Sequence, residues 1–416
     1  MRWELFPDVT CDVSRDGSLA ESKSAAVELP NDIKVDGGVF KLSFQRLSGG
    51  KSQGVELLEI DTGAIRVFIV PMRGMGLWKA VTVQTDENSK AIDSFSGNEI
   101  GWQSPVKGPV HPAFVPVHDA SGIGWLEGFD ELLVRCGLES NGAPEFNLNG
   151  TLKHPLHGRI ANLPASSLSV SVDPESGTLE VVGTILETRF LVQSLQLQVT
   201  YRFEINRAVV NVTDIVTNCS SKPTTMQLLY HINIGQRILE AGSKCVAALA
   251  EIVPKNSHSA NSVDRWDEYD GPVSGFEEQV YFAKPQSNDR GWTTALLHDS
   301  NKNTGIALRY DTRTLPYFTL WKNTAAVEDG YVTGLEPATG FPNTKSFEAQ
   351  ASRVIKLAAG ESRSFSVQLE ALSDPSDVAR VQKEIEALRT SKCCIHNEPI
   401  AKWCEGIEAA SLTETG

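Results

Sequence analysis

The chain has 416 residues, of which 41% are hydrophobic and 22% are charged, a composition typical of a folded globular protein. Its 52 acidic and 38 basic residues give a formal net charge of −14, which argues against general binding to nucleic acid or to an anionic membrane surface. The length allows two ordinary domains or one large all-β domain.

The N-terminal stretch MRWELFPDVTCDV has no apolar run of signal-peptide length, and nowhere do about eighteen apolar residues follow one another. The seven cysteines are odd in number and scattered, without CxxC spacing, which is typical of reduced thiols in a cytosol. We therefore expect a cytoplasmic protein with no membrane span and no nucleic-acid partner. An acidic chain can still hold a local anion site, so a phosphorylated ligand stays open.

Alternation of apolar and polar residues predicts strands along most of the chain. The clearest case is LQLQVTYRFE (195–204), where every second residue from Leu195 to Phe203 is apolar and the residues between them are polar. Similar β-rich runs recur between turn signals such as DPESG and AAGES. These runs are residues 64–71, 168–172, 178–185, 208–218, 305–311, 316–321 and 365–369.

Helical periodicity is convincing only in DPSDVARVQKEIEALRT (374–390). Asp374 is a candidate N-cap, Pro375 suits the first turn, and apolar residues recur at helical spacing from Val378 to Leu388. Many short strands and one short C-terminal helix predict an all-β protein built as a large antiparallel β-sandwich.

The chain shows no repeat of fixed period and no long linker, so we expect one domain over residues 1–390. Residues 1–50 would form an extension packed on that domain, either covering a site or mediating assembly. Residues 391–416 end in small polar side chains and would form a loosely ordered tail. The sequence leaves the oligomeric state open.

The stretch HPLHGRIANLP (154–164) sets His154 and His157 three residues apart, followed by Gly158 and Arg159. The histidines could bind a metal, one could act in acid–base chemistry beside a cationic group, or both could be loop residues. A metal site needs further ligands, and the sequence nearby offers no HExxH motif, no carboxylate at metal spacing and no cysteine pair. We therefore expect no metal here, while Gly158 permits close approach of a ligand or of backbone.

Two other residues are candidates for chemistry. His231 interrupts the apolar run TTMQLLYHINIGQ, and a histidine in such a run is more often a hydrogen-bonded core residue than a functional one. Glu336 lies between glycine and proline in GLEPATGFPN, which would present a carboxylate at a sheet edge or simply place it in a surface turn. Neither residue identifies a reaction when taken alone.

The order of HGRIANLP, NCSSKPTTMQLLYHINIG and GLEPATG resembles the galactose mutarotase-like superfamily, which includes aldose 1-epimerases and hexose-6-phosphate mutarotases. Other segments resemble one branch of that superfamily in the same order. They are VPMRGMGLW (70–78), GWQSPVKGPVHP (101–112), GWLEGFDELLVRCGL (124–138), EEQVYF (277–282) and PYFTLWKN (316–323). The resemblance implies a supersandwich fold and an isomerase acting on the anomeric carbon of a free or phosphorylated sugar.

The resemblance also implies roles for individual residues. Glu336 matches the general base, His231 the general acid, and His157 the histidine that holds the sugar and assists proton movement. Arg73, in the MRGMG segment, matches a binding arginine, and Arg159 is a second candidate for that role.

This chain departs from the familiar mutarotases in two places. It reads YHINIG where they carry an NHxYFNL strand, and it has no clear counterpart of the acid that binds sugar hydroxyls. Glu278 in EEQVYF is our choice for that acid. The remaining substrate-binding candidates are Asn233, Trp321, Lys322 and His111, although Trp321 could equally be a core aromatic.

Mutarotation opens a cyclic hemiacetal and closes it on the other face, so one group takes a proton from the anomeric hydroxyl while another protonates the ring oxygen. A carboxylate and an imidazole can both donate and accept, and the reaction needs no cofactor. Two alternatives stay open: a sugar sensor without catalysis, or another sugar isomerase, epimerase or lyase on the same scaffold. A hydrolase would need two carboxylates across the scissile bond, and only one is well placed.

Overall fold

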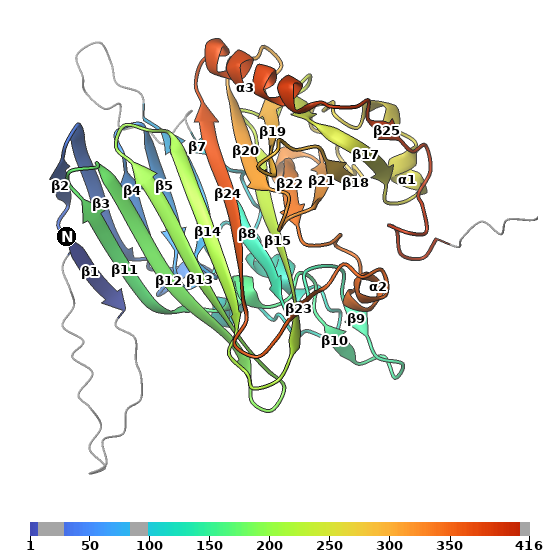
Figure 1. Ribbon diagram of the computed structural model, residues 1–416, viewed down its shortest axis with the longest axis horizontal. Coiled ribbons are helices and arrows are strands. Elements are labelled where there is room, and N and C mark those ends of the chain that lie inside the picture. Colours follow the sequence, from blue (N-terminus) through green and yellow to red (C-terminus); the bar gives the residue numbers. More distant parts are fainter. Residues whose placement is uncertain (7–28, 84–98, 408–416) are drawn as a thin grey trace, which may run out of the picture.

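Two large β-sheets stack face to face around one apolar core in the computed structural model, which describes residues 1–6, 29–83 and 99–407 (Figure 1). Within these residues every strand pairing in the two sheets is antiparallel except one, between β17 and β25, whose bounds are given below. The predicted class, a large antiparallel β-sandwich with a short C-terminal helix, is confirmed.

The first sheet has nine strands, and its middle strands are long and regularly alternating. Across the sheet they are β1 (Arg2–Phe6), β11 (Ala165–Asp173), β12 (Thr178–Arg189), β13 (Gln193–Glu204), β14 (Val209–Asn218), β24 (Ser362–Leu372), β20 (Gly305–Asp311), β19 (Trp292–His298) and β16 (Lys244–Ala247). The alternating run 195–204 lies within β13, and its apolar residues are buried as predicted.

The second sheet has fourteen strands. Along its main path they are β2 (Asp32–Val35), β3 (Gly38–Arg46), β4 (Glu56–Asp61), β5 (Ile65–Val70), β6 (Gly76–Thr82), β8 (Leu133–Leu138), β15 (Thr224–Gly235), β22 (Val332–Ala338), β21 (Tyr317–Asn323), β18 (Gln279–Pro285), β17 (Leu249–Pro254) and β25 (Cys394–Ile395). Two short strands are attached beside this path, β7 (Glu99–Ile100) on β6 and β23 (Ile355–Leu357) on β15. A separate hairpin joins β9 (Glu145–Phe146) to β10 (Leu152–His154).

One ion pair crosses the core between the sheets. Arg135 on β8 and Asp214 on β14 are both completely buried, and Arg135 Nη2 donates to Asp214 Oδ1 at 3.0 Å. The hydroxyl of Tyr230 on β15 also donates to Asp214, at 2.9 Å. This buried network therefore ties the two sheets together where apolar packing surrounds it.

The C-terminal helix is confirmed as α3 (Pro375–Leu388). Asp374 caps it by accepting from the backbone N–H groups of Ser376 and Asp377, and its apolar face from Val378 to Leu388 is buried against the nine-stranded sheet. Two short helices that the periodicity did not predict are α1 (Ser257–Ala260) and α2 (Lys345–Gln350). Within the described residues, no helix combines the length and apolar character that crossing a bilayer would require.

Both ends of the chain are built into the sandwich more closely than expected. In the described part of residues 1–50, β1 forms an edge of one sheet, and β2 and β3 extend the other. The expectation of a loosely ordered C-terminal tail is wrong for residues 391–407, because β25 pairs with β17 and Trp403 is buried in an apolar cluster with Phe341. Residues 408–416 lie outside the described residues.

Candidate active site

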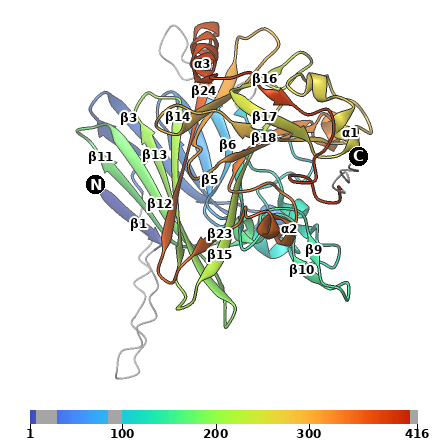
Figure 2. The same ribbon diagram turned by 45° about the vertical axis from the view of Figure 1, so that its right-hand side comes forward.

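A cavity of about 250 Å³ lies on the face of the fourteen-stranded sheet that is turned away from the core. Tyr230 points into the core toward Asp214, so the next residue on β15, His231, points to the opposite face and lines the cavity. Figure 2 brings forward β17 and β18; Lys255 directly follows β17, Glu278 directly precedes β18, and both line the cavity. The lining residues are Trp125, Leu126, Phe129, Ala143, Leu156, His157, His231, Lys255, Glu278, Val280, Thr319, Trp321, Glu336 and Pro342.

His231 and Glu336 meet because their strands are neighbours. The antiparallel register of β15 and β22 pairs Ile232 with Leu335, which sets His231 directly opposite Glu336 on the cavity face. Nε2 of His231 lies 3.2 Å from Oε1 of Glu336, and the two side chains are only 6% and 3% exposed. The predicted acid and base therefore lie side by side as a buried pair.

Asn233 determines which nitrogen of His231 carries hydrogen. Its amide nitrogen donates to the backbone carbonyls of Glu131 and His231, so its amide oxygen is the atom that lies 2.5 Å from Nδ1 of His231. Nδ1 must therefore donate, which leaves Nε2 as a lone pair facing Glu336. Asn233 does not line the cavity. It orients the ring of His231 through the hydrogen bond to Nδ1.

The pKa values of His231 and Glu336 are shifted in opposite directions by burial. Burial raises the pKa of Glu336 well above its usual value, the neighbouring Glu278 carboxylate raises it further, and the charge of Lys255 opposes this rise. Burial, assisted by the nearby His157, lowers the pKa of His231 to about 3. Both shifts favour the uncharged forms, a neutral imidazole and a protonated carboxyl group, over an ion pair.

His157 is the second histidine of the cavity, and it lies in the turn after β10 with a left-handed φ of 55°. Its Nδ1 lies 2.9 Å from the carbonyl oxygen of Asn141 and donates to it, so Nε2 is an acceptor. The rings of His157 and His231 are 5.5 Å apart. The following residue, Gly158, serves backbone packing, because a Cβ there would lie 2.1 Å from the carbonyl oxygen of Ser140.

The stability of the protein should depend on pH through His157. Burial lowers its pKa from 6.5 to about 4, so the unfolded chain gains a proton below pH 6.5 while the folded chain stays neutral until about pH 4. Acidification across this window therefore favours unfolding. Between about pH 7.5 and pH 5, we expect the free energy of unfolding to fall by about 2 kcal/mol more in the wild type than in His157→Gln, measured by urea denaturation. Equal losses in the two proteins would contradict the lowered pKa of His157.

Aromatic rings enclose the pair. The ring of Phe129 lies 5.1 Å and that of Trp321 5.3 Å from the ring of His231, and Trp125 lies 4.6 Å from His157. Nε1 of Trp321 donates to Oε2 of Glu278 at 2.7 Å, so this carboxylate is fixed at the mouth of the cavity. Such walls suit the apolar face of a sugar ring, while the carboxylate suits its hydroxyls.

Neither of the two predicted binding arginines lines the cavity. Arg73 is 1% exposed, and its guanidinium is used by the carboxylate of Glu131, the side chain of Asn162 and the carbonyl of Gly128. Arg159 lies 3.9 Å from Glu139 and 3.8 Å from Glu187, outside the cavity lining. The binding roles predicted for Arg73 and Arg159 do not hold, because each guanidinium group lies beside carboxylates outside the cavity.

Lys322 and His111 are also placed elsewhere. Lys322 follows Trp321 on β21 and therefore points to the other face of the sheet, where its ammonium group lies 4.9 Å from the centre of the Tyr269 ring. His111 caps a short turn by accepting from the backbone N–H of Ala113 at 3.1 Å. Neither residue lines the cavity.

Gly334 is a site residue that the sequence reasoning missed. It lies two residues before Glu336 on β22 and so faces the same side. A Cβ at Gly334 would lie 2.6 Å from Oε1 of Glu336 and 3.0 Å from Cε1 of His231. The signal available in the sequence was the glycine at strand spacing from the candidate glutamate.

We expect Gly334→Ala to separate the histidine–carboxyl pair while leaving the fold intact. The added methyl group occupies the space of the Glu336 carboxyl group, so this group must move away from His231. Sugar binding and NMR anomer exchange are measured on the variant and on the wild type. Exchange should be at least tenfold slower in the variant, while its melting transition is kept. Unchanged exchange would mean that the contact between the two groups is not needed.

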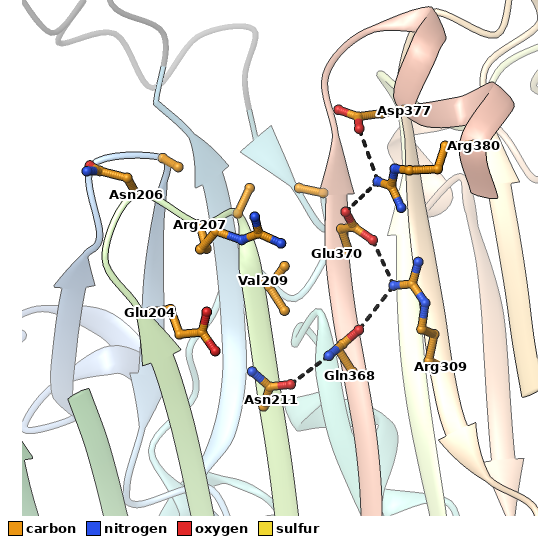
Figure 3. Close-up of a pocket in the computed structure, with 13 residues that line it drawn as sticks. Glu204, Asn206, Arg207, Val209, Asn211, Arg309, Gln368, Glu370, Asp377 and Arg380 are labelled. Atoms are coloured by element: carbon orange, nitrogen blue, oxygen red, sulfur yellow. Dashed lines mark hydrogen bonds and ion pairs between the residues drawn. The ribbon is translucent and has the colours of Figure 1, made fainter. Parts of the chain in front are cut away.

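A larger cavity, of about 690 Å³, lies on the outer face of the nine-stranded sheet beside α3 (Figure 3). Its charged side chains are largely paired with one another: Glu370 accepts from Arg380 at 2.6 Å and lies 2.7 Å from Arg309. Gln368 continues this ladder by donating to Asn211 at 2.7 Å. No histidine and no buried histidine–carboxyl pair are among the described residues that line this larger cavity, so the smaller cavity is the candidate active site.

The two stacked sheets are those of the galactose mutarotase-like class of β-sandwich. A candidate aldose 1-epimerase of Klebsiella pneumoniae is 30% identical to this chain, with a TM-score of 0.83 over 96% of this chain and 99% of that one. A galactose mutarotase-like protein of Clostridium acetobutylicum shares the fold at 16% identity, with a TM-score of 0.52 over 80% of this chain and 98% of that one.

A family model described as a domain of unknown function, DUF4432, matches residues 52–371, and the chain belongs to this family. No curated protein matches the sequence. The scaffold is therefore that of the aldose 1-epimerase-like proteins, and the reaction has to be argued from the site.

Proposed function

We propose that this protein interconverts the anomers of an aldose by acid–base ring opening. The observation that carries the proposal is the buried pair of His231 and Glu336, whose Nε2 and Oε1 atoms lie 3.2 Å apart at the wall of a sugar-sized cavity. Two groups that both accept and donate protons, side by side and shielded from water, are what hemiacetal opening requires. The fold family and its candidate aldose 1-epimerase relative support the same reaction class.

In the proposed reaction Glu336 is the general base and His231 the general acid, which requires that a proton pass from the carboxyl group to the imidazole in the sugar complex. Glu336 takes the proton of the anomeric hydroxyl, His231 gives its proton to the ring oxygen, and the bond between the anomeric carbon and the ring oxygen breaks as the aldehyde forms. After rotation about the bond between the first two carbons, the same transfers run in reverse on the other face. Every proton comes from the pair or the sugar, so the reaction needs no cofactor.

The other cavity residues would hold the sugar. His157 Nε2 would accept a hydrogen bond from a hydroxyl, Glu278 would accept others, and Trp321 would pack against the ring. Six cysteines in the described part of the chain are free thiols, which suits a reducing compartment, and we propose the cytoplasm.

The test is anomer exchange measured by NMR magnetisation transfer on a panel of aldoses, with and without the purified protein. Exchange faster than the uncatalysed rate for some sugar, increasing with protein concentration, is the expected result. Saturable binding of a sugar without faster exchange would replace the enzyme by a sugar sensor. A chemically changed product would instead indicate another isomerase or lyase.

A further inference from the structure

Lys255 is the one lysine or arginine that lines the cavity in the described part of the chain. It directly follows β17, and its backbone N–H donates to the carbonyl of Val280 on β18 at 2.9 Å. The thiol of Cys404 lies 3.5 Å from the carbonyl oxygen of the preceding residue, Pro254, and donates to it. The backbone that carries Lys255 is therefore fixed by the neighbouring strand and by the docked C-terminal segment.

The ammonium group of Lys255 has no partner within the described residues, because no ion pair or hydrogen bond involves its side chain. Glu278, the exposed carboxylate that also lines the cavity, accepts from Trp321 and makes no ion pair with it. The arginines expected in a binding role are engaged elsewhere, Arg73 with Glu131 and Arg159 beside Glu187. Lys255 is thus the available positive charge for a ligand.

The surroundings of Lys255 strengthen the attraction between its ammonium group and an anion. The deeper wall carries aromatic rings and two histidines, His157 and His231, whose pKa values burial lowers to about 4 and about 3, so it supplies no competing cation near neutral pH. A charge-assisted hydrogen bond gains strength in such a medium. The same cavity contains Lys255 and the His231–Glu336 pair, so one ligand can reach both.

We propose that Lys255 binds an acidic group of the substrate, so that the preferred sugars carry a carboxylate or a phosphate away from the anomeric carbon. That the acidic sugar is also a substrate rests on the proposed function. The binding of an acidic sugar by Lys255 does not depend on turnover.

The experiment compares matched ligands that differ in the acidic group: hexoses, the corresponding hexuronates and the corresponding hexose 6-phosphates, in the gluco, galacto and manno series. Binding is measured by titration calorimetry on Glu336→Gln, with and without Lys255→Met, and exchange is measured by NMR on the wild type and on Lys255→Met. Lys284→Met is the matched control, because Lys284 is a half-buried lysine that packs 5.3 Å from the Trp403 ring outside the cavity.

We expect at least one acidic sugar to bind about tenfold more tightly than its neutral counterpart, and Lys255→Met to remove that difference while Lys284→Met keeps it. Comparison of the hexuronate and 6-phosphate arms identifies the acidic group. Lys255-dependent binding of an acidic sugar without exchange would support this inference and overturn the proposed reaction. Equal binding of acidic and neutral sugars, or a preference that survives Lys255→Met, would overturn this inference even if exchange is catalysed.

Discussion

Replacing Glu336 by glutamine is expected to slow anomer exchange by a factor of about 10²–10⁴, the usual contribution of a positioned acid or base. Glutamine keeps the shape of the side chain and can still hydrogen-bond to Nε2 of His231, 3.2 Å away, but its amide cannot exchange a proton with the sugar. His231→Asn should cause a loss of similar size, because the proton pathway needs both members. The double variant should be little slower than either single one.

The chain contains a matched control for this prediction. Nε2 of His396 lies 2.9 Å from Oε1 of Glu251, but these two side chains are 29% and 28% exposed and lie outside the cavity. Glu251→Gln makes the same chemical change in a glutamate–histidine pair that water reaches, and exchange should stay at the wild-type rate. Equal losses in Glu251→Gln and Glu336→Gln would point to damage to the fold rather than to lost proton transfer.

Replacing Arg135 by methionine is expected to lower the free energy of unfolding by about 3–5 kcal/mol. Both members of the Arg135–Asp214 pair are completely buried, so removal of the guanidinium leaves a carboxylate in the core with only the hydroxyl of Tyr230 as a charge-stabilising partner among the described contacts. The backbone carbonyl of Met75, which now accepts from Arg135 at 2.9 Å, would also lose that donor. Urea denaturation followed by fluorescence measures the change.

Two further variants separate the buried charge from the loss of side-chain packing. Arg135→Met combined with Asp214→Leu removes both charges and should recover much of the lost stability. Arg202→Met breaks the exposed pair with Glu180, whose side chains are 50% and 40% exposed, and should cost less than about 1 kcal/mol. A cost of this small size for Arg135→Met would show that the buried pair is not the main tie between the sheets.

The sequence by itself determined the elements that depend on local pattern. The alternation in residues 195–204 predicts β13 and its buried face, because side chains on a strand point to opposite sides in turn. The N-cap at Asp374 and the apolar spacing after it predict α3, because caps and helical spacing act within a few residues. His157, His231 and Glu336 were also within reach, through the resemblance of their short motifs to a known superfamily.

The tertiary structure alone decided which charges enter the cavity. Arg73 and Lys255 are both cations beside apolar runs, and no local pattern shows that Arg73 turns inward to Glu131 while Lys255 stays unpaired at the cavity. The docking of Trp403 likewise depends on Phe341, which lies far away in the chain. Ion pairing and apolar packing act between residues that only the fold brings together, so local sequence pattern predicted the strands and the helix but not which cation lines the cavity.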